Sequence, residues 1–136
     1  MIFADSCVLI DLIEQDTHWG DWSQAALDEW GRRGSVLINP VIYAELSPEF
    51  SDPSTLDHVL ESVGIEYREI PREALFLAAR AHQSYRRRGG VRTGVLADFF
   101  VGAHARVLGV PVLTRDQKRF RSYFPGLALV TPEGPQ

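Results

Sequence analysis

The sequence predicts an α/β protein: a three-layer α/β/α domain built on a parallel sheet of about five short strands. Short apolar runs alternate along the chain with longer segments of helical periodicity, a pattern typical of a parallel sheet covered on both faces. The length of 136 residues suits one domain, and no linker, repeat or low-complexity tract divides the chain. We therefore expect residues 1–136 to form a single domain.

Five short segments are the predicted strands. Most of them are apolar, and the first ends directly at an acid, Asp5. In a parallel sheet the carboxyl ends of the strands meet at one edge, which is where sites of this fold class lie. The predicted strands span residues 2–4, 36–38, 65–70, 110–113 and 127–130.

Helices are predicted between these strands from capping residues and apolar spacing. Asn39 is a favourable N-cap, Pro40 suits the first turn of a helix, and Pro71 opens another helix. The segment 95–108 is nearly all apolar, which predicts a buried helix. Further helices are predicted from residue 8, over residues 19–30, from residues 51–53, and beyond Asp116.

The net charge of −4 conceals an asymmetry between the two halves of the chain. Residues 1–68 hold thirteen acidic residues and three arginines, a balance of −10, whereas residues 69–136 hold five acidic and eleven basic residues, a balance of +6. A basic half of this kind suggests a polyanionic partner such as nucleic acid. The alternative is a set of solvated arginines.

Several classes of protein lack support in this sequence. Cys7 is the only cysteine, so an internal disulfide is excluded, and the four histidines are too far apart for a local zinc motif. Neither a signal peptide, an apolar run of membrane-spanning length, a G-x-S-x-G elbow nor a phosphate-cradling glycine loop is found. We expect a soluble cytoplasmic protein.

Four acidic residues stand where this fold would bring them together. Asp5 ends the first strand and Asp116 lies just past the fourth, while Asp98 lies in the first turn of the buried helix. Glu45 lies inside a helix, among apolar neighbours. Clustered carboxylates repel one another, and oxygen ligands without His or Cys favour Mg²⁺ or Mn²⁺. The four acids together predict a metal site that acts on phosphate esters.

Each acid also has an ordinary structural explanation. Asp98 could complement the N-terminus of its helix, and Asp5 and Asp116 could cap the helices that follow them. Glu45 could extend into solvent. The placement of all four at one sheet edge favours the metal site over four separate coincidences.

Candidate substrate-binding residues surround these acids. Ser6 and Thr114 could orient carboxylates or bind phosphate, with turn formation or capping as the alternative. The basic run at the end of one helix suits phosphate contacts, although cations at a helix C-terminus are favourable on their own. The candidates are Ser6, Thr114, Arg86, Arg87, Arg88, Arg92 and Arg115. Trp19, Trp22 and Trp30 share helical spacing and belong either to the core or to a partner groove.

Four segments, in this order and at this chain length, resemble the PIN domain, and within it the VapC ribonuclease toxins of prokaryotic toxin–antitoxin pairs. The resemblance covers nearly the whole chain. The segments are residues 4–11 (ADSCVLID), 39–46 (NPVIYAEL), 96–105 (LADFFVGAHA), and 113–116 (LTRD) followed by Tyr123-Phe124-Pro125.

The resemblance implies a Mg²⁺-dependent endoribonuclease, with Mn²⁺ as a possible substitute, that hydrolyses RNA through an acidic pocket. Asp5 and Asp98 would be the firmest metal ligands. Asp116 would add to the metal site, often through water, and Glu45 would position water or metal. All four positions hold acids, so nothing indicates an inactive site.

The resemblance also implies protein partners. Members of the family typically dimerise and are silenced by a cognate VapB-type antitoxin, which covers the active site and a hydrophobic groove. Trp19, Trp22 and Trp30, together with residues 86–92, would be candidate antitoxin contacts.

Other functions stay open from the sequence. A structure-specific DNA nuclease would use the same acids, because discrimination of the 2′-OH depends on the geometry of the site. A non-catalytic RNA-binding PIN module is a second alternative, which four intact acids disfavour. A receiver-like signalling domain is a third, disfavoured because Lys118, the only lysine, lies beyond Asp116.

Overall fold

The computed structural model describes residues 1–91, 96–132 and 134–135. Its strands are β1 (Ile2–Ala4), β2 (Val36–Ile38), β3 (Ile65–Tyr67), β4 (Val112–Leu113), β5 (Leu129–Thr131) and β6 (Gly134–Pro135). They form one sheet in the order β3-β2-β1-β4-β5-β6. The five strands from β3 to β5 run parallel, and β6 pairs antiparallel with β5. The parallel sheet of about five strands is confirmed.

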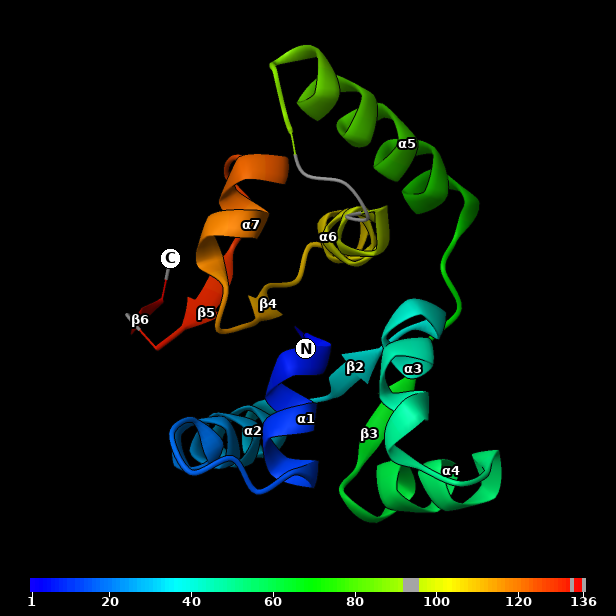
Figure 1. Cartoon of the computed structure of the whole chain (residues 1–136), viewed down its shortest axis with the longest axis vertical. Coiled ribbons are helices and arrows are strands. Elements are labelled where there is room, and N and C mark those ends of the chain that lie inside the picture. Colours follow the sequence, from blue (N-terminus) through cyan, green and yellow to red (C-terminus); the bar gives the residue numbers. More distant parts are fainter. Residues whose placement is uncertain (92–95, 133, 136) are drawn as a thin grey trace.

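Helices cover both faces of this sheet. They are α1 (Ser6–Ile13), α2 (Gly20–Arg33), α3 (Pro40–Leu46), α4 (Pro53–Ser62), α5 (Arg72–Arg87), α6 (Leu96–Leu108) and α7 (Gln117–Tyr123), with a 3-10 turn at Ser47–Glu49. Figure 1 shows α5, α6 and α7 on one side of the sheet and α1, α2 and α4 on the other. The three-layer α/β/α architecture is therefore confirmed. Within the described part of the chain, none of the helices has the length and apolarity needed to cross a bilayer.

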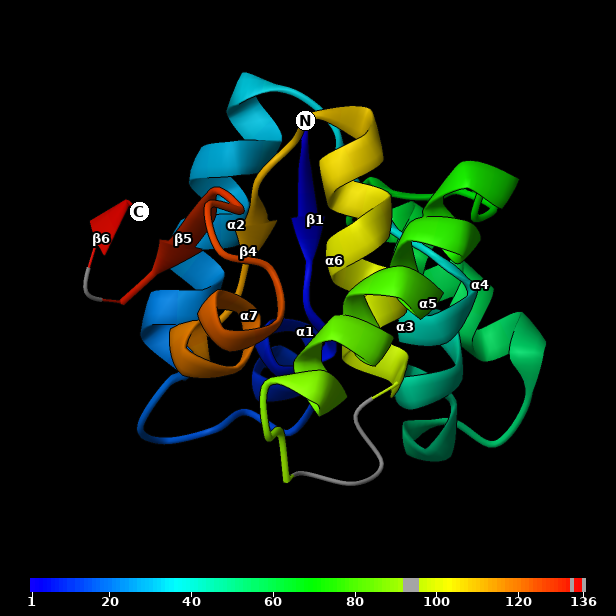
Figure 2. The same cartoon turned by 90° about the horizontal axis from the view of Figure 1, so that it is seen from above.

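The topology reverses between β1 and β4, which are hydrogen-bonded neighbours at the middle of the sheet. The chain leaves β1 for α1 on one face, and leaves β4 for α7 on the opposite face (Figure 1). Figure 2 looks onto the sheet and shows α7 and the start of α6 toward the carboxyl end of β1, while Figure 1 shows the end of α5 farther from the sheet. A crevice at such a reversal is the usual place for a ligand in an open α/β sheet.

The central strands are the most buried part of the molecule. Ile2, Phe3 and Ala4 of β1 and Leu37 and Ile38 of β2 have no exposed surface. Such continuous burial is expected for parallel strands with helices on both faces. As a consequence, a residue that directly follows β1 or β4 begins inside the protein and not at its surface.

The ends of three predicted strands differ from the structure. The strand predicted at 127–130 is observed at Leu129–Thr131, and the other two differ for identifiable reasons. The strand predicted at 65–70 stops at Tyr67, because its neighbour β2 ends where Asn39 caps α3 and leaves nothing further to pair with. The strand predicted at 110–113 begins at Val112, because the Val110 amide donates to Ala105 O at the end of α6. The short strand β6 in the C-terminal Pro/Gly segment was not expected.

Candidate active site

Asp5 follows β1 and is held in place by groups from two strand ends. It is 2% exposed, and its Oδ1 accepts the Ser6 amide at 2.9 Å as the cap of α1. Its Oδ2 accepts the hydroxyl of Thr114, which follows β4, at 2.8 Å. Thr114 is fully buried, and its Oγ1 also accepts the Asp116 amide at 3.1 Å. Thr114 therefore orients Asp5, which is one of the two roles considered for it.

Asp98 and Asp116 approach the same point from two helices. Asp98 lies in the first turn of α6 and is 7% exposed. Asp116 caps α7 by accepting the Arg119 amide at 3.2 Å, and its side chain is 43% exposed. The capping role considered for Asp5 and Asp116 is thus present in both, and it does not compete with their clustering.

The three aspartates meet around one cationic group, the guanidinium of Arg119. Its Nη1 lies 3.0 Å from both carboxylate oxygens of Asp98, and its Nη2 lies 3.1 Å from Asp5 Oδ2. Its Nε lies 2.8 Å from Asp116 Oδ2, where the charges pair although the N–H is not aimed at the oxygen. The sequence places Arg119 only among the basic residues after Asp116, so its central position was not anticipated. A signal was nevertheless present, because residues three apart on a helix face one another.

The electrostatics of Arg119 favour its charged form. Burial alone would lower its pKa, but the carboxylates of Asp5, Asp98 and Asp116 act in the opposite direction, and the pKa lies above its usual value. The guanidinium thus stays protonated and offsets part of the negative charge of the cluster. Three carboxylates outnumber this one cation, so the site retains an excess of negative charge.

Glu45 completes the set of four predicted acids at the rim of the site. α3, which carries Glu45, packs against α1 and α6. Glu45 is exposed as a whole residue, but the partial burial of its carboxyl group raises the pKa of Glu45. A hydrogen bond with the Ser6 side chain lowers that pKa, whereas Asp5 and Asp98 raise it further. The influence of Asp5 and Asp98 on this pKa indicates that the Glu45 carboxyl group lies close to the aspartates.

The donor set suits a hard divalent cation. The convergent groups are carboxylate oxygens, and the only cysteine nearby donates its thiol to Asp5 Oδ2 at 3.4 Å. Burial, and then the charge of Asp5, raise the pKa of Cys7 to about 12, so this thiol is no thiolate ligand or nucleophile. By donor chemistry the residues fit Mg²⁺ or Mn²⁺. Among the described residues, no three acidic, His or Cys side chains are arranged as a ready-made metal site, because the guanidinium lies between the acids.

A polar pocket of 320 Å³ adjoins the cluster. It is lined by Cys7 from α1 and by Arg115, Asp116, Gln117, Lys118 and Arg119. Arg119 thus belongs both to the acid cluster and to the wall of this pocket. Three of the six lining side chains are cationic, which suits an anionic occupant.

The predicted substrate-binding arginines differ in how free they are. Arg86 and Arg87 are exposed in the last turn of α5, whereas Arg88 donates to Ser84 Oγ at 2.9 Å and to Ser122 O at 2.7 Å. Arg92 lies outside the described residues. Arg115 is held by two hydrogen bonds to Asp11, from Nε at 2.7 Å and from Nη2 at 3.0 Å. Of the four candidate arginines that the structure describes, Arg86 and Arg87 have the side chains best placed to meet a substrate at the surface.

The tryptophans mostly take the core role. Trp22 and Trp30 are partly buried against the core, and Arg33 covers the Trp30 ring at 4.3 Å. Trp19 is partly buried, with the Arg115 guanidinium 5.4 Å from its ring centroid.

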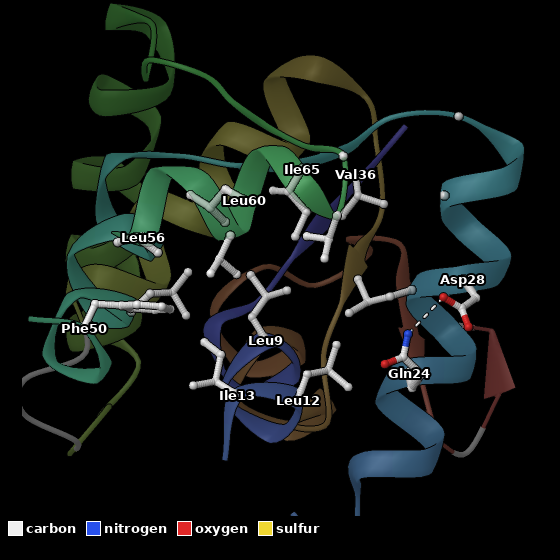
Figure 3. A pocket seen from close by; sticks show the side chains of 17 residues that line it. Leu9, Leu12, Ile13, Gln24, Asp28, Val36, Phe50, Leu56, Leu60 and Ile65 are labelled. Atoms are coloured by element: carbon white, nitrogen blue, oxygen red, sulfur yellow. Dashed lines mark hydrogen bonds between the residues drawn. The ribbon is translucent and has the colours of Figure 1, made fainter. Parts of the chain in front are cut away.

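The apolar groove of the molecule lies elsewhere, between α1, α2 and α4. It has a volume of 420 Å³, and none of the three tryptophans lines it. Figure 3 shows its floor and walls, with Leu9 and Leu12 from α1 facing Leu56 and Leu60 from α4. At its α2 wall, Gln24 donates to Asp28 at 3.0 Å. The sequence did not indicate this groove, because its lining comes from several separate segments that only the fold brings together.

Comparison with solved structures finds this fold in chains of toxin–antitoxin complexes. A chain of VapBC2 from Rickettsia felis, bound to a promoter DNA fragment, matches with a TM-score of 0.75 and 18% identity, over 96% of this chain and 98% of that one. A chain of a toxin–antitoxin complex from Klebsiella pneumoniae gives 0.71 and 19%, over 97% and 98%. FitAcB from Neisseria gonorrhoeae gives 0.69 and 20%, over 98% and 99%. The fold implied by the resemblance is confirmed. No protein-family model matches the sequence, and no curated protein matches it.

Proposed function

We propose that this chain is a Mg²⁺-dependent endoribonuclease of the PIN-domain, VapC type and the toxin of a VapBC-type toxin–antitoxin pair. One observation carries the proposal: Asp5, Asp98 and Asp116 converge on a single cationic group at the point where the sheet topology reverses. The shared fold with chains of the VapBC and FitAB complexes supports it.

The residues would divide the work by burial and position. Asp5 and Asp98, which are nearly inaccessible, would hold the metal directly, and the more exposed Asp116 would contribute through water. A bound Mg²⁺ supplies Lewis acidity and an activated water for in-line hydrolysis of a phosphodiester. Thr114 and the Ser6 amide keep the Asp5 carboxylate at one angle. Glu45, at the rim, would orient the attacking water.

The substrate would approach over a basic surface. Arg86 and Arg87 at the end of α5, and Lys118 and Arg121 on α7, are exposed. α7 lies toward the carboxyl edge of the sheet (Figure 2), and the end of α5 is joined to α7 by the hydrogen bond from Arg88 to Ser122 O. Phosphate contacts of this kind hold a nucleic acid without reading its sequence.

The apolar groove between α1, α2 and α4 would receive the antitoxin. Asp28 is the acidic residue among the mainly apolar side chains that line this groove. An apolar segment with flanking basic residues therefore matches the groove. A homodimer is also part of this proposal. It predicts a molecular mass in solution of twice 15.3 kDa for the chain without antitoxin, measurable by light scattering.

Cleavage of labelled RNA in Mg²⁺ or Mn²⁺ tests the proposal. We expect wild type to cut RNA, to lose activity in chelator, and to regain it when Mg²⁺ is restored. Asp98→Asn should abolish cleavage while the circular dichroism spectrum stays native. The matched control is Asp21→Asn, an exposed aspartate on α2, which should cut normally.

The remaining outcomes contradict parts of the proposal. Equal cleavage by wild type and Asp98→Asn would remove the metal site from this pocket. Preferential cutting of matched single-stranded DNA would make the chain a DNA nuclease. RNA binding by folded protein without any cleavage would favour a non-catalytic binding module.

A further inference from the structure

One guanidinium stands where the proposed function needs a divalent cation. Arg119 reaches Asp5, Asp98 and Asp116 through three different nitrogens, at distances from 2.8 to 3.1 Å. Its side chain is 21% exposed, so most of its surface is buried. The acids therefore already have a resident counter-ion, supplied by the helix that follows Asp116.

The guanidinium and a metal ion cannot share this position. Mg²⁺ binds oxygen ligands at about 2.0–2.1 Å, so two neighbouring ligand oxygens lie only about 3 Å apart. In the structure the carboxylates are arranged around the three nitrogens of the guanidinium, and no three-acid metal arrangement is present among the described residues. Binding of the ion requires Arg119 to withdraw and the acids to close in.

We expect the Arg119 side chain to move into the polar pocket beside the cluster when it leaves the aspartates. Arg119 already forms part of its wall, next to Lys118 and Gln117. The third cation on this wall, Arg115, is not available to a ligand in the same way, because both its hydrogen-bonding nitrogens engage the buried Asp11. A guanidinium turned toward the pocket would bind a phosphate through two parallel hydrogen bonds.

We propose that Arg119 exchanges partners during the reaction cycle: it is the counter-ion of Asp5, Asp98 and Asp116 before the divalent cation binds, and a ligand of the RNA phosphate afterwards. The inference rests on the proposed function in requiring a divalent cation at the three aspartates. Arg119 has two roles in this proposal and cannot fill both of them at the same time.

Metal affinity without substrate is the first test. Mn²⁺ binding is measured by titration calorimetry and by the electron paramagnetic resonance signal of free Mn²⁺. Arg119→Gln should bind Mn²⁺ more tightly than wild type by about tenfold or more, because the ion no longer displaces a positive charge in contact with its ligands. Arg121→Gln, which removes the same charge from an exposed position on the same helix, should change the affinity by less than about twofold.

Thermal unfolding provides a second readout, which remains informative if Arg119→Gln is less stable than wild type. In chelator, Arg119→Gln should unfold at a lower temperature than wild type, because its acids have lost their cation. Added Mg²⁺ should raise the melting temperature of this variant more than that of wild type. A variant that folds only with metal gives the same result in stronger form. Arg119→Lys keeps the positive charge but loses the planar, forked arrangement of donors, and it should bind Mn²⁺ with intermediate affinity. This variant replaces Arg119→Gln in the experiment if Arg119→Gln does not fold.

Kinetics test the second role. At saturating Mg²⁺, Arg119→Gln should cleave RNA about 100-fold more slowly than wild type, with partial rescue in Arg119→Lys. Cleavage at the wild-type rate by metal-saturated Arg119→Gln would overturn the phosphate role. If wild type binds Mn²⁺ and Arg119→Gln binds it no more tightly than Arg121→Gln does, the exchange is refuted while the proposed function stands. If wild type and all variants fail to bind Mn²⁺, the proposed metal site itself fails.

Discussion

Arg115, just before α7, and Arg119, on α7, lie four residues apart and contact different carboxylates. Arg119 joins the three aspartates of the candidate active site, whereas Arg115 pairs with Asp11 of α1. Asp11 is 3% exposed and also accepts the Ser23 hydroxyl at 2.8 Å. This buried carboxylate therefore ties α1 and α2 to the segment that follows β4. The charge count does not distinguish the two arginines, and the sequence does not show which carboxylates each of them contacts.

Replacement of Arg115 should be costly in stability. Arg115→Ala leaves Asp11 buried without its cation, and we expect a loss of about 2–3 kcal/mol, below the full cost for a buried pair because Arg115 is 29% exposed. Urea unfolding followed by circular dichroism measures this loss. Arg121→Ala, at an exposed position, should change stability by less than about 0.5 kcal/mol. Equal stability of the two variants would show that the contact between Arg115 and Asp11 does not contribute to the free energy of unfolding.

The join between β2 and α3 depends on a buried polar pair. Asn39 caps α3 by accepting the amides of Val41 and Ile42, both at 3.1 Å. Its Nδ2 lies 3.3 Å from Nδ1 of His104, a residue of α6 that is 1% exposed and packs on the Phe3 ring. Because Asn39 offers an N–H here, Nδ1 must accept, and His104 is neutral in the folded protein. Burial accordingly lowers the pKa of His104, and the charge of Arg68 adds to this.

Stability should therefore fall in acid, in part through His104. Its folded-state pKa lies below the usual value of 6.5, so the unfolded chain binds a proton that the folded chain resists once the pH drops below 6.5. The free energy of unfolding should decrease from pH 7.5 to pH 5.5, and the decrease should be smaller in His104→Gln. His58→Gln, at an exposed histidine of α4, should retain the wild-type decrease. Identical decreases in all three proteins would show that His104 does not contribute.

The apolar groove is the proposed antitoxin site, and two equally exposed hydrophobic residues, one in the groove and one outside it, allow this to be tested. Val63 lines the groove and is 62% exposed, whereas Phe76 is 63% exposed on α5, on the other side of the sheet. Val63→Glu should weaken binding of the cognate antitoxin by about tenfold or more, because a charge then meets an apolar segment. Phe76→Glu should leave it within about twofold. Titration calorimetry measures both affinities, and a loss confined to Phe76→Glu would place the antitoxin on α5.

The asymmetry of charge along the sequence becomes an asymmetry in space. Arg86 and Arg87 end α5, which contacts α7 of the candidate active site, while Arg32 and Arg33 end α2 in the acidic half of the sequence. Each pair occupies the last turn of its helix, where cations are favourable. Position relative to the site is the main difference between the two pairs, which makes them a natural comparison.

The salt dependence of RNA binding should separate these two pairs. In chelator, where no cleavage is expected, the double variant Arg86→Ala/Arg87→Ala should lower the slope of log K against log salt by about 1.4, from two lost phosphate contacts to single-stranded RNA. Arg32→Ala/Arg33→Ala should leave the slope unchanged. Fluorescence anisotropy at several salt concentrations provides the slopes. Equal reductions in both double variants would mean that total charge, and not this surface, binds the RNA.

Much of the fold is local in origin, and this part was predictable. The alternation of apolar runs with capped helical segments identified the α/β class and the five parallel strands, since a residue such as Asn39 acts on its own neighbours. The four acids were also predictable, because Asp5 and Asp116 follow strands and parallel strands end at one edge. Their roles as metal ligands stay predictions.

The pattern of apolar runs and capping residues could not predict contacts between segments that are distant in the sequence. Arg119 looks like any surface arginine after Asp116, and its place among Asp5 and Asp98 depends on how α7 packs beside α6. The apolar groove likewise needs α1, α2 and α4 to assemble before it exists. Periodicity and capping act over a few residues, so they specify which elements form and where their ends lie. The partner of each charge and the shape of each surface follow from the packing of those elements.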